Sequence, residues 1–453
     1  MAYLPLLFVW VLWYYGRHDM SNTPPFAAIA RAHFVGVGGI GMSALARLFL
    51  GEGKQVSGSD RAPSAITDAL TQEGMQFFMA QVAGNITPDI DLVVYTEAMP
   101  HDHEELIAAR TLGIPTINYF DALGMVANQY RLIAVAGSHG KTTTTAMLID
   151  IFEKAGFDPT AIVGSLRAVT HSNYRKGKGS YFIVEACEYK RDFLSLTPDV
   201  LVITNIELEH VDYYKTLEEV IAAFREFALQ VREGGTIIAN LSDAAMQPVI
   251  DAVASRGVRV VNYAKHVDPL MSLQVPGMHN RLNAAAAIAA AEACGITPEV
   301  AKAALADFRG TWRRFEYKGE VQGAKIYDDY GHHPTEIVAT IKGARELYPE
   351  RTLTLIFQSH TYTRTDALFN DFVHALALAD RVCVLPIYAA REKNESGITH
   401  EALAQAVAAS QPATHAYDSF EAAVAAVRPT LSEKDLVLVM GAGTITRVAD
   451  MLV

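Results

Sequence analysis

The chain has 453 residues, of which 50% are hydrophobic and 19% are charged, and its formal net charge is -12. This length predicts two or three domains of ~150 residues, and the composition is that of an ordered globular protein. The acidic balance argues against a nucleic-acid binder, which needs a basic face. Cys187, Cys294 and Cys383 are widely separated and offer neither a disulfide framework nor a metal-ligand spacing, which is typical of a reducing cytoplasm.

The N-terminal stretch "MAYLPLLFVWVLWYYGRHDM" is mostly apolar. Its apolar part is shorter than the ~20 residues that span a bilayer, and it lacks the basic start and small-residue cleavage site of a signal peptide. Two interpretations remain, a weak membrane-surface anchor or extra sequence ahead of a true start at Met20, and we favour the second. We therefore expect residues 1–29 to form an irregular extension, with no stable membrane insertion and a cytoplasmic location.

Strand-like apolar runs alternate with helical patterns along the chain, which predicts βαβ units and parallel sheets. The first series has strands at 32–38, 55–60, 91–98 and 114–120, with a helix at 41–53. A second series starts with a strand, a glycine loop and a helix over 131–156, and its later strands lie within 181–189, 199–210 and 234–243. A third starts near residue 308 and has strands at 324–330, 352–359, 381–387 and 435–443.

These series predict a three-domain α/β protein. We expect a Rossmann-like N-terminal domain at 30–128 and a central domain at 129–307 with a parallel sheet like that of P-loop ATPases. A C-terminal Rossmann-like α/β domain would occupy 308–453.

The first glycine loop, "GVGGIG", places Gly36, Gly38 and Gly41 in G-x-G-x-x-G spacing between a strand and a helix. Such glycines allow a pyrophosphate to approach the backbone at the start of the helix. Asp60 ends the next strand, where an acid could hold a ribose hydroxyl. The motif alone indicates a nicotinamide-dependent oxidoreductase, but any diphosphate-linked nucleoside suits it, and the glycines could also serve close helix–strand packing.

The second glycine loop, "GSHGKTTTT", is shorter than a standard phosphate-binding loop, because Val135 occupies the position of the first glycine, five residues before Gly140. The backbone amides of 137–142 can still cradle phosphates at a helix start. Lys141 can reach the β- and γ-phosphates, and the Thr142 hydroxyl can bind Mg²⁺. The alternative is a polar first turn of a helix, but four threonines in succession are poor helix formers and need another reason.

Polar residues follow the neighbouring strands of this second series. Glu185 ends "YFIVE", and "NIELEHVD" supplies Glu207, Glu209, His210 and Asp212 after another strand. Mg²⁺ is usually held by one or two protein groups together with water and phosphate oxygens. Because these groups share strand ends with a phosphate loop, we favour a functional role for Glu185 and His210 over that of solvated loop residues.

Several segments together resemble a known family. "GSHGKTTTT", "EACEY" and "TNIELEHVDYY" resemble the ATP-binding domain of the Mur ligases, the ATP-dependent amino-acid and peptide ligases of peptidoglycan precursor synthesis. The likeness runs from His33 to the end of the chain. It includes "HFVGVGGIGMSALA", "SGSD", "VPGMHNRLNAAAAIAAA", "FRGTWRRFEYKG", "DDYGHHPTEI", "FQSHTYTRT" and "LPIYAARE". The N-terminal segments are most similar to members that join L-alanine to UDP-N-acetylmuramate.

The resemblance implies a reaction in which ATP converts the lactyl carboxylate of UDP-N-acetylmuramate into an acyl phosphate, which L-alanine then attacks. It also implies the site residues. The UDP-sugar would meet Gly36, Gly38, Gly39, Gly41, Met42, Ser43, Ser59, Asp60, Thr96 and His139. ATP would meet Gly137, Ser138, His139, Gly140, Lys141, Thr142, Thr143, His279, Asn280, Asn283, Arg313 and Asp328. The amino acid would meet His360, Arg364 and Tyr388.

The same resemblance assigns the chemistry. Thr142, Glu185 and His210 would hold Mg²⁺, with two ions expected. The catalytic residues would be Lys141, His210, His332 and Arg314. His333 is an alternative to His332 for orienting the amine or the acyl phosphate, and the identity of a general base stays open.

The chain departs from the family pattern at three places. Ser359 replaces a usual proline, and Ser138 stands where threonine is frequent. The segment between Tyr263 and Pro276 is shorter than in the family, which puts the stability of the central domain and the wall of the adenine pocket in question.

Three alternative functions are less consistent with these motifs. A sister ligase that adds a recycled tripeptide to the same sugar nucleotide is disfavoured by "YGHHP" and by the compact C-terminal domain. A dehydrogenase would explain the first domain alone. A non-catalytic paralogue is disfavoured because Lys141, Thr142, Glu185 and His210 are all present. We expect UDP-N-acetylmuramate and L-alanine as substrates, no nucleic-acid partner, and a monomer or weak dimer.

Overall fold

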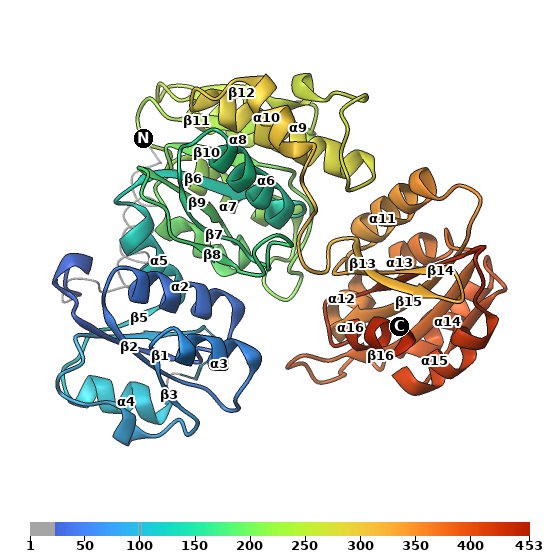
Figure 1. The fold of residues 1–453 in the computed structure, drawn as a ribbon, viewed down its shortest axis with the longest axis horizontal. Coiled ribbons are helices and arrows are strands. Elements are labelled where there is room, and N and C mark those ends of the chain that lie inside the picture. Colours follow the sequence, from blue (N-terminus) through green and yellow to red (C-terminus); the bar gives the residue numbers. More distant parts are fainter. Residues whose placement is uncertain (1–22, 98, 101) are drawn as a thin grey trace, which may run out of the picture.

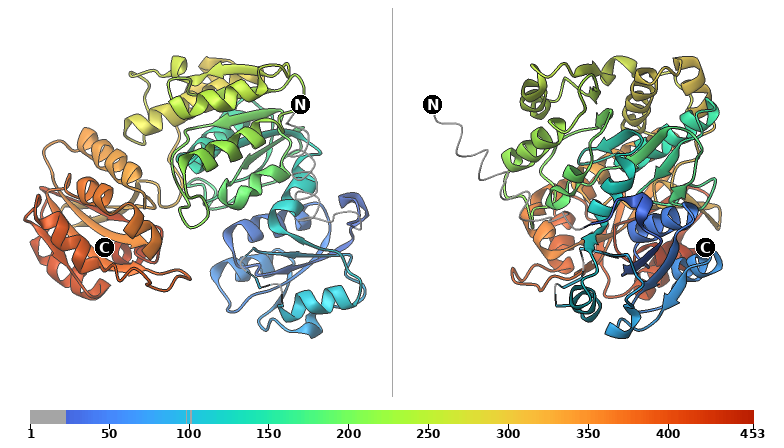
Figure 2. Two further views of the ribbon diagram at one scale, coloured as in Figure 1. Left: turned by 180° about the vertical axis from the view of Figure 1, so that it is seen from behind. Right: turned by 90° about the vertical axis from the view of Figure 1, so that its left-hand side faces the viewer.

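The computed structural model describes residues 23–97, 99–100 and 102–453. The expectations for the first 20 residues, including a start at Met20, lie outside these ranges. Three lobes are visible, each built on its own sheet: an N-terminal lobe in blue, a central lobe in green and yellow, and a C-terminal lobe in orange and red (Figure 1). Seen from behind, the two outer lobes flank the central one (Figure 2). Within the described ranges, no helix combines the length and the apolar character that crossing a membrane requires.

The N-terminal lobe contains a five-stranded, all-parallel sheet of order β3-β2-β1-β4-β5. Its strands are β1 Arg31–Val35, β2 Gln55–Ser59, β3 Gln76–Phe78, β4 Leu92–Tyr95 and β5 Thr116–Asn118. Its helices are α2 Ile40–Gly51, α3 Ala65–Gln72, α4 Glu104–Thr111 and α5 Tyr119–Ala127. The strand order reverses next to β1, so the loop after β1 opens into the crevice where such sheets bind nucleotides.

The central lobe contains a seven-stranded sheet of order β12-β11-β10-β6-β9-β7-β8, parallel except for the β7–β8 pair. Its strands are β6 Arg131–Ala136, β7 Thr160–Ile162, β8 Tyr174–Arg175, β9 Tyr181–Glu185, β10 Val200–Ile203, β11 Thr236–Ala239 and β12 Arg259–Asn262. Its helices are α6 Lys141–Lys154, α7 Leu217–Ala228, α8 Gln247–Val253, α9 Met278–Ala293 and α10 Pro298–Leu305. Strand β6 lies between β9 and β10 and runs parallel to both, so the carboxyl ends of these three strands lie side by side at one edge of the sheet.

The C-terminal lobe contains a six-stranded sheet of order β13-β14-β18-β15-β16-β17, in which only the β13–β14 pair is antiparallel. Its strands are β13 Glu316–Val321, β14 Ala324–Asp329, β15 Thr352–His360, β16 Arg381–Tyr388, β17 Thr414–Ala416 and β18 Asp435–Met440. Its helices are α11 Pro334–Leu347, α12 Tyr362–Ala367, α13 Phe369–Leu376, α14 His400–Ala408, α15 Phe420–Val427 and α16 Thr446–Leu452.

The three-part α/β architecture predicted from the sequence is confirmed. The predicted boundary at 128/129 falls between α5 and β6, and that at 307/308 falls between α10 and β13. Six strands were not predicted from the sequence: β3, β8, β12, β13 and β17, which lie at sheet edges, and β7, which lies beside one. Short edge strands carry little of the apolar pattern that identifies longer, buried ones.

Helix α9 shows how the central core is closed. Ala284 to Ala291 are all buried, and α9 packs against α6, because small side chains let two helices approach closely. The shortened segment between Tyr263 and Pro276 also contributes, since Met271 and Val275 are buried in the same core. The shorter segment therefore still closes this face of the sheet.

The segment 164–176, between β7 and β9, links the central lobe to both of its neighbours. The Trp312 backbone N–H, in the linker that follows α10, donates to Leu166 O at 2.8 Å. The Asn173 side-chain amide donates to Ile40 O, in the first turn of α2. Asn173 is completely buried, so this contact between lobes excludes water.

Candidate active site

The phosphate loop joins β6 to α6 and requires glycine at two positions. Gly137 has φ 132° and Gly140 has φ 81°, in the left-handed region that L side chains rarely adopt. A Cβ at Gly137 would overlap Thr204 Oγ1, and one at Gly140 would overlap the Asn283 amide. The loop thus turns tightly between β10 and α9, and the first N–H groups of α6 are left to bind an anion.

Lys141 is the first residue of α6, and its ammonium group already has three protein acceptors. Its Nζ donates to Gly137 O at 2.6 Å, to Ser138 O at 3.1 Å and to Glu188 Oε1 at 2.9 Å. Burial alone would lower the pKa of Lys141, but the Glu188 charge outweighs it and raises that pKa. The lysine is therefore fully charged and folded back onto its own loop.

Glu188 is a site residue that the sequence analysis missed, although it lies within "EACEY", three residues after Glu185. Its side chain is 1% exposed, and Oε1 lies 3.5 Å from His210 Nε2 as well as beside Lys141. Burial would raise the pKa of Glu188, but Lys141 and His210 lower it, so the carboxyl is ionised. The signal in the sequence was a second acidic residue, after Glu185, following a buried strand.

The candidate metal ligands form two neighbouring pairs beside the phosphate loop, Thr142 with Glu185 and His210 with Glu188. Thr142 Oγ1 lies 2.9 Å from Glu185 Oε2, which also accepts a hydrogen bond from Gly164 N at 2.9 Å. His210, with φ 54°, follows β10 and points its Nε2 at Glu188. Hydroxyl and carboxylate oxygens are the ligands that Mg²⁺ prefers, and one oxygen of Glu188 is buried without a hydrogen-bond partner in the described structure. These residues fit a magnesium ion.

A cavity of about 260 Å³ adjoins the loop and lies between the central and C-terminal lobes. Its lining includes the predicted ATP residues His139, Gly140, Thr143, His279, Asn280 and Asn283. Tyr263 and Val275 from the shortened segment also line it, so that segment still supplies a wall. Burial lowers the pKa of His279 to about 4, which leaves its imidazole neutral.

Two predicted ATP residues, Arg313 and Asp328, lie outside the lining of this cavity. Asp328 is completely buried and pairs with Arg313, whose Nε lies 3.1 Å from Asp328 Oδ2. Arg313 also donates to Gly443 O at 3.0 Å, so its guanidinium is held within the C-terminal lobe. Asp328 and Asp329 are successive residues of β14, so their side chains point to opposite faces, and Asp329 lines the cavity. Arg314, next to Arg313 in the linker, lines it as well. Burial raises the pKa of Asp329 to about 6.

The predicted amino-acid residues lie together on the C-terminal lobe, facing the central one. The rings of His360 and Tyr388 are stacked with centroids 5.6 Å apart. Arg364 Nη2 donates across the lobes to Glu209 Oε1 at 2.5 Å, and its Nη1 donates to His360 O at 3.2 Å. His332 lies 5.8 Å from His360 by ring centroids, and burial lowers the pKa of His332 to about 3.

His139 forms the centre of a second contact between these lobes. Its Nε2 lies 3.5 Å from Glu207 Oε2, and its Nδ1 lies 3.4 Å from Glu336 Oε1. Burial lowers the pKa of His139, but the two carboxylates outweigh it and raise that pKa to about 10. Thr335 Oγ1 also donates to Glu207 Oε2 at 2.8 Å. The imidazolium thus bridges the phosphate loop and the first turn of α11.

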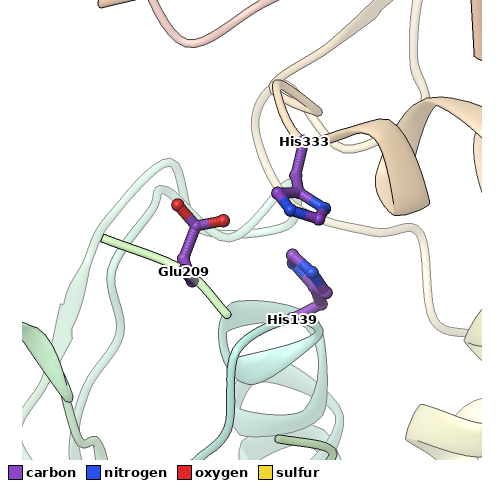
Figure 3. Close-up of side chains that lie close together, drawn as sticks. All are labelled: His139, Glu209 and His333. Carbon is purple, nitrogen blue, oxygen red and sulfur yellow. The ribbon is translucent and has the colours of Figure 1, made fainter. Parts of the chain in front are cut away.

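Figure 3 shows the rings of His139 and His333 facing each other, with the Glu209 carboxylate beside them. One ligand atom from each lies within 4.8 Å of the others, which is a spacing that a metal ion could bridge. Two cations already occupy this place, however: the His139 imidazolium and the Arg364 guanidinium, which is bonded to Glu209. The cluster is therefore an ion-pair contact between lobes.

The glycine loop of the N-terminal lobe is held by an acid. Asp60 Oδ2 accepts from Gly38 N at 2.7 Å, and Gly36 has φ 83°. Ser43 and Ser59 are completely buried and bond to protein groups, since Ser59 donates to Glu105 and Ser43 to the backbone of α2. Both hydroxyls are closed off from solvent, and their assignment to the UDP-sugar stays a prediction. The other predicted residues here are Gly39, Gly41, Met42 and Thr96, and Met42 is buried with 3% exposure.

Three family models match the chain, one for each lobe. The Mur ligase family catalytic domain matches residues 31–131, the Mur ligase middle domain matches 135–269, and the Mur ligase glutamate ligase domain matches 313–443.

The chain is 39% identical to the UDP-N-acetylmuramate–L-alanine ligase of Agathobacter rectalis, over 94% of this chain and 98% of that protein. It is 38% identical to the ligase of the same name from Alkaliphilus metalliredigens, over 93% and 96%. Among solved structures, the UDP-N-acetylmuramate-alanine ligase of Thermotoga maritima is similar, with a TM-score of 0.76, 27% identity and coverage of 93% and 98%. A murein peptide ligase from Psychrobacter arcticus, with a TM-score of 0.66 at 24% identity and the same coverage, shares the fold. The resemblance drawn from the motifs is confirmed, and the chain belongs to the Mur ligase family.

Proposed function

We propose that this protein joins L-alanine to the lactyl carboxylate of UDP-N-acetylmuramate, with conversion of ATP to ADP and phosphate, in peptidoglycan precursor synthesis. The two relatives named for this reaction support it, since they align over more than nine tenths of the chain. The observation that carries the proposal is the meeting of Lys141, Thr142, Glu185 and His210 at one sheet edge, beside a cavity closed by the C-terminal lobe.

ATP is required because a carboxylate is a poor electrophile and its oxygen is a poor leaving group. Transfer of the γ-phosphoryl group to the lactyl carboxylate makes an acyl phosphate, which the amine attacks, and phosphate then leaves. Lys141 would neutralise the transferring group, Thr142 and Glu185 would hold one Mg²⁺, and His210 would hold a second. When bound, Mg²⁺ would offset the repulsion between the carboxylate and the triphosphate. Arg314, which lines the cavity, would add positive charge there.

Positioning of the amino acid would fall to the C-terminal lobe. We assign the alanine carboxylate to Arg364 and His360, with Tyr388 as the wall behind them. His332 would orient the amine or the acyl phosphate; a group with a pKa of about 3 is too weak a base to hold a proton at neutral pH. Glu209 would hold the Arg364 guanidinium in place, because it accepts from both Nε and Nη2.

At the nucleotide ends, we propose that the UDP diphosphate lies against the loop at Gly36 and Gly38, and that the adenosine of ATP lies in the cavity near His279 and Asn283. Asp60 would act on UDP through the loop that it holds. His139 would lie close to where the two substrates meet. We further propose domain boundaries at 128/129 and 307/308, a monomeric or weakly dimeric state, and a cytoplasmic location.

The test is phosphate release from ATP by the purified protein with UDP-N-acetylmuramate and one amino acid at a time. We expect release with L-alanine, and weaker or no release with glycine, L-serine or the recycled tripeptide. Release that requires the tripeptide would establish the sister ligase instead. Absence of release with every acceptor, in a sample that binds ADP, would overturn the ligase assignment.

A further inference from the structure

Glu188 lies between the phosphate-loop lysine and the histidine that follows β10. Its Oε1 is 2.9 Å from Lys141 Nζ and 3.5 Å from His210 Nε2, while its Oε2 is buried and has no hydrogen-bond partner in the described part of the chain. A buried carboxylate oxygen without a partner is costly unless a cation or donor arrives. The Glu188 carboxylate is thus suited to bind a cation or to accept a further hydrogen bond.

The backbone holds Glu188 in this place. The Tyr214 hydroxyl donates to Glu188 O at 2.6 Å. Lys190 and Arg191, directly after it, have φ 52° and 64°, a conformation that side chains rarely adopt and that surrounding contacts must enforce. The carboxylate is therefore a fixed charge beside the phosphate loop.

This fixed charge opposes a nucleotide. In the structure, the Lys141 ammonium donates three hydrogen bonds, two to loop carbonyls and one to Glu188. A bound phosphate must therefore compete with Glu188 for this ammonium group. Once the lysine turns to the phosphates, Glu188 loses its counter-charge and faces the anionic nucleotide. A divalent cation beside His210 would restore neutrality for both anions.

We infer that Glu188 is a positioning residue that holds Lys141 in the free enzyme and makes nucleotide binding depend on a divalent cation. The inference rests on the proposed function in one respect, namely that nucleotide phosphates bind at the loop of residues 137–142. It adds a role for a carboxylate outside the set formed by Thr142, Glu185 and His210.

The test is the affinity for ADP, measured by calorimetry with excess Mg²⁺ and again with a chelator, which requires no ligation. For Glu188→Gln, metal-free ADP should bind about tenfold more tightly than to the unchanged protein, because removing one charge a few ångströms away frees Lys141 for the phosphates. The ratio of metal-free to Mg²⁺-bound dissociation constants should fall by at least about tenfold. Glu188→Asp keeps the charge and should keep the metal dependence.

Asp380→Asn is the matched control, since it removes the charge of another carboxylate from an ion pair, that with Arg345 in the C-terminal lobe. It should leave the ratio unchanged. Equal loss of ADP affinity with and without Mg²⁺ in Glu188→Gln, with a normal thermal unfolding transition, would show a merely structural role and overturn the inference. If Glu188→Gln does not fold, a Glu188→Asp protein that has lost its metal dependence would overturn it as well. Failure of the unchanged protein to bind ADP at all would overturn the proposed function itself.

Discussion

The molecule contains two glycine loops of the same local form, one after β1 and one after β6, and they differ in what surrounds them. The loop at Gly36 is held by Asp60 and backed by buried serines that bond to protein. The loop at Gly137 has ionisable groups from the ends of two neighbouring strands, β9 and β10, directed at it. A strand, a glycine turn and a helix start give a place for phosphate in both lobes, but only the second adds the charges that phosphoryl transfer needs.

The largest effect should come from removing the lysine that only the second loop has. Lys141→Ala should lower the rate of phosphate release by about 10²–10³-fold, because the transferring phosphoryl group loses its nearest cation. UDP-N-acetylmuramate binding, measured by calorimetry, should change little. Full ligation by this variant would contradict the role that we give to the central loop.

The glycines of the two loops should also differ in tolerance. Gly140→Ala forces φ 81° on an alanine, which costs about 1–2 kcal/mol, and places a methyl group against the Asn283 amide. We expect ADP affinity to fall by at least tenfold. Gly39→Ala is the control, because Gly39 has φ -67° and the nearest atom to a new Cβ would be 3.7 Å away. Its free energy of unfolding should change by less than about 0.5 kcal/mol.

Alkaline pH should act on the second loop through His139. Its pKa is raised to about 10 from an ordinary 6.5, so the stabilisation of the ion pairs with Glu207 and Glu336 is complete below pH 6.5 and is lost as pH rises through 10. The free energy of unfolding should therefore decline over this window, and His139→Gln should remove that part of the slope. Parallel curves for the two proteins in denaturant titrations from pH 6 to 10 would contradict the pairing.

The smallest effect should come from the acid of the first loop. Asp60→Asn keeps an acceptor for Gly38 N but removes the charge from that hydrogen bond, which is a loss of about 1 kcal/mol. UDP-N-acetylmuramate should bind about fivefold more weakly, with ADP affinity unchanged. A change in ADP affinity instead would mean that the two loops are not independent sites.

Local patterns in the sequence were sufficient to predict the sheets and the glycine loops. They were insufficient to predict contacts between segments that are far apart in the chain. Buried parallel strands are continuous apolar runs, so the three sheets and both loops were predictable. Asp328 and Asp329 could not be told apart, because which of two adjacent side chains faces a cavity depends on the sheet's position against another lobe. The environment of His139 likewise depends on Glu336, which is nearly 200 residues away and approaches only when two lobes meet. Glu188 could have been singled out from its place in "EACEY", but its pairing with Lys141 is visible only in the structure.

The segment 164–176 couples the three lobes of the molecule mechanically. The Gly164 N–H donates a hydrogen bond to the Glu185 carboxylate, and the Leu166 carbonyl accepts one from the Trp312 N–H. The Asn173 side-chain amide donates a third to the backbone of the first turn of α2. One short stretch of chain thus connects the start of α2, the linker that precedes the C-terminal lobe and the Glu185 carboxylate of the central lobe. A movement of either outer lobe would therefore displace the Glu185 carboxylate, unless one of these hydrogen bonds broke first.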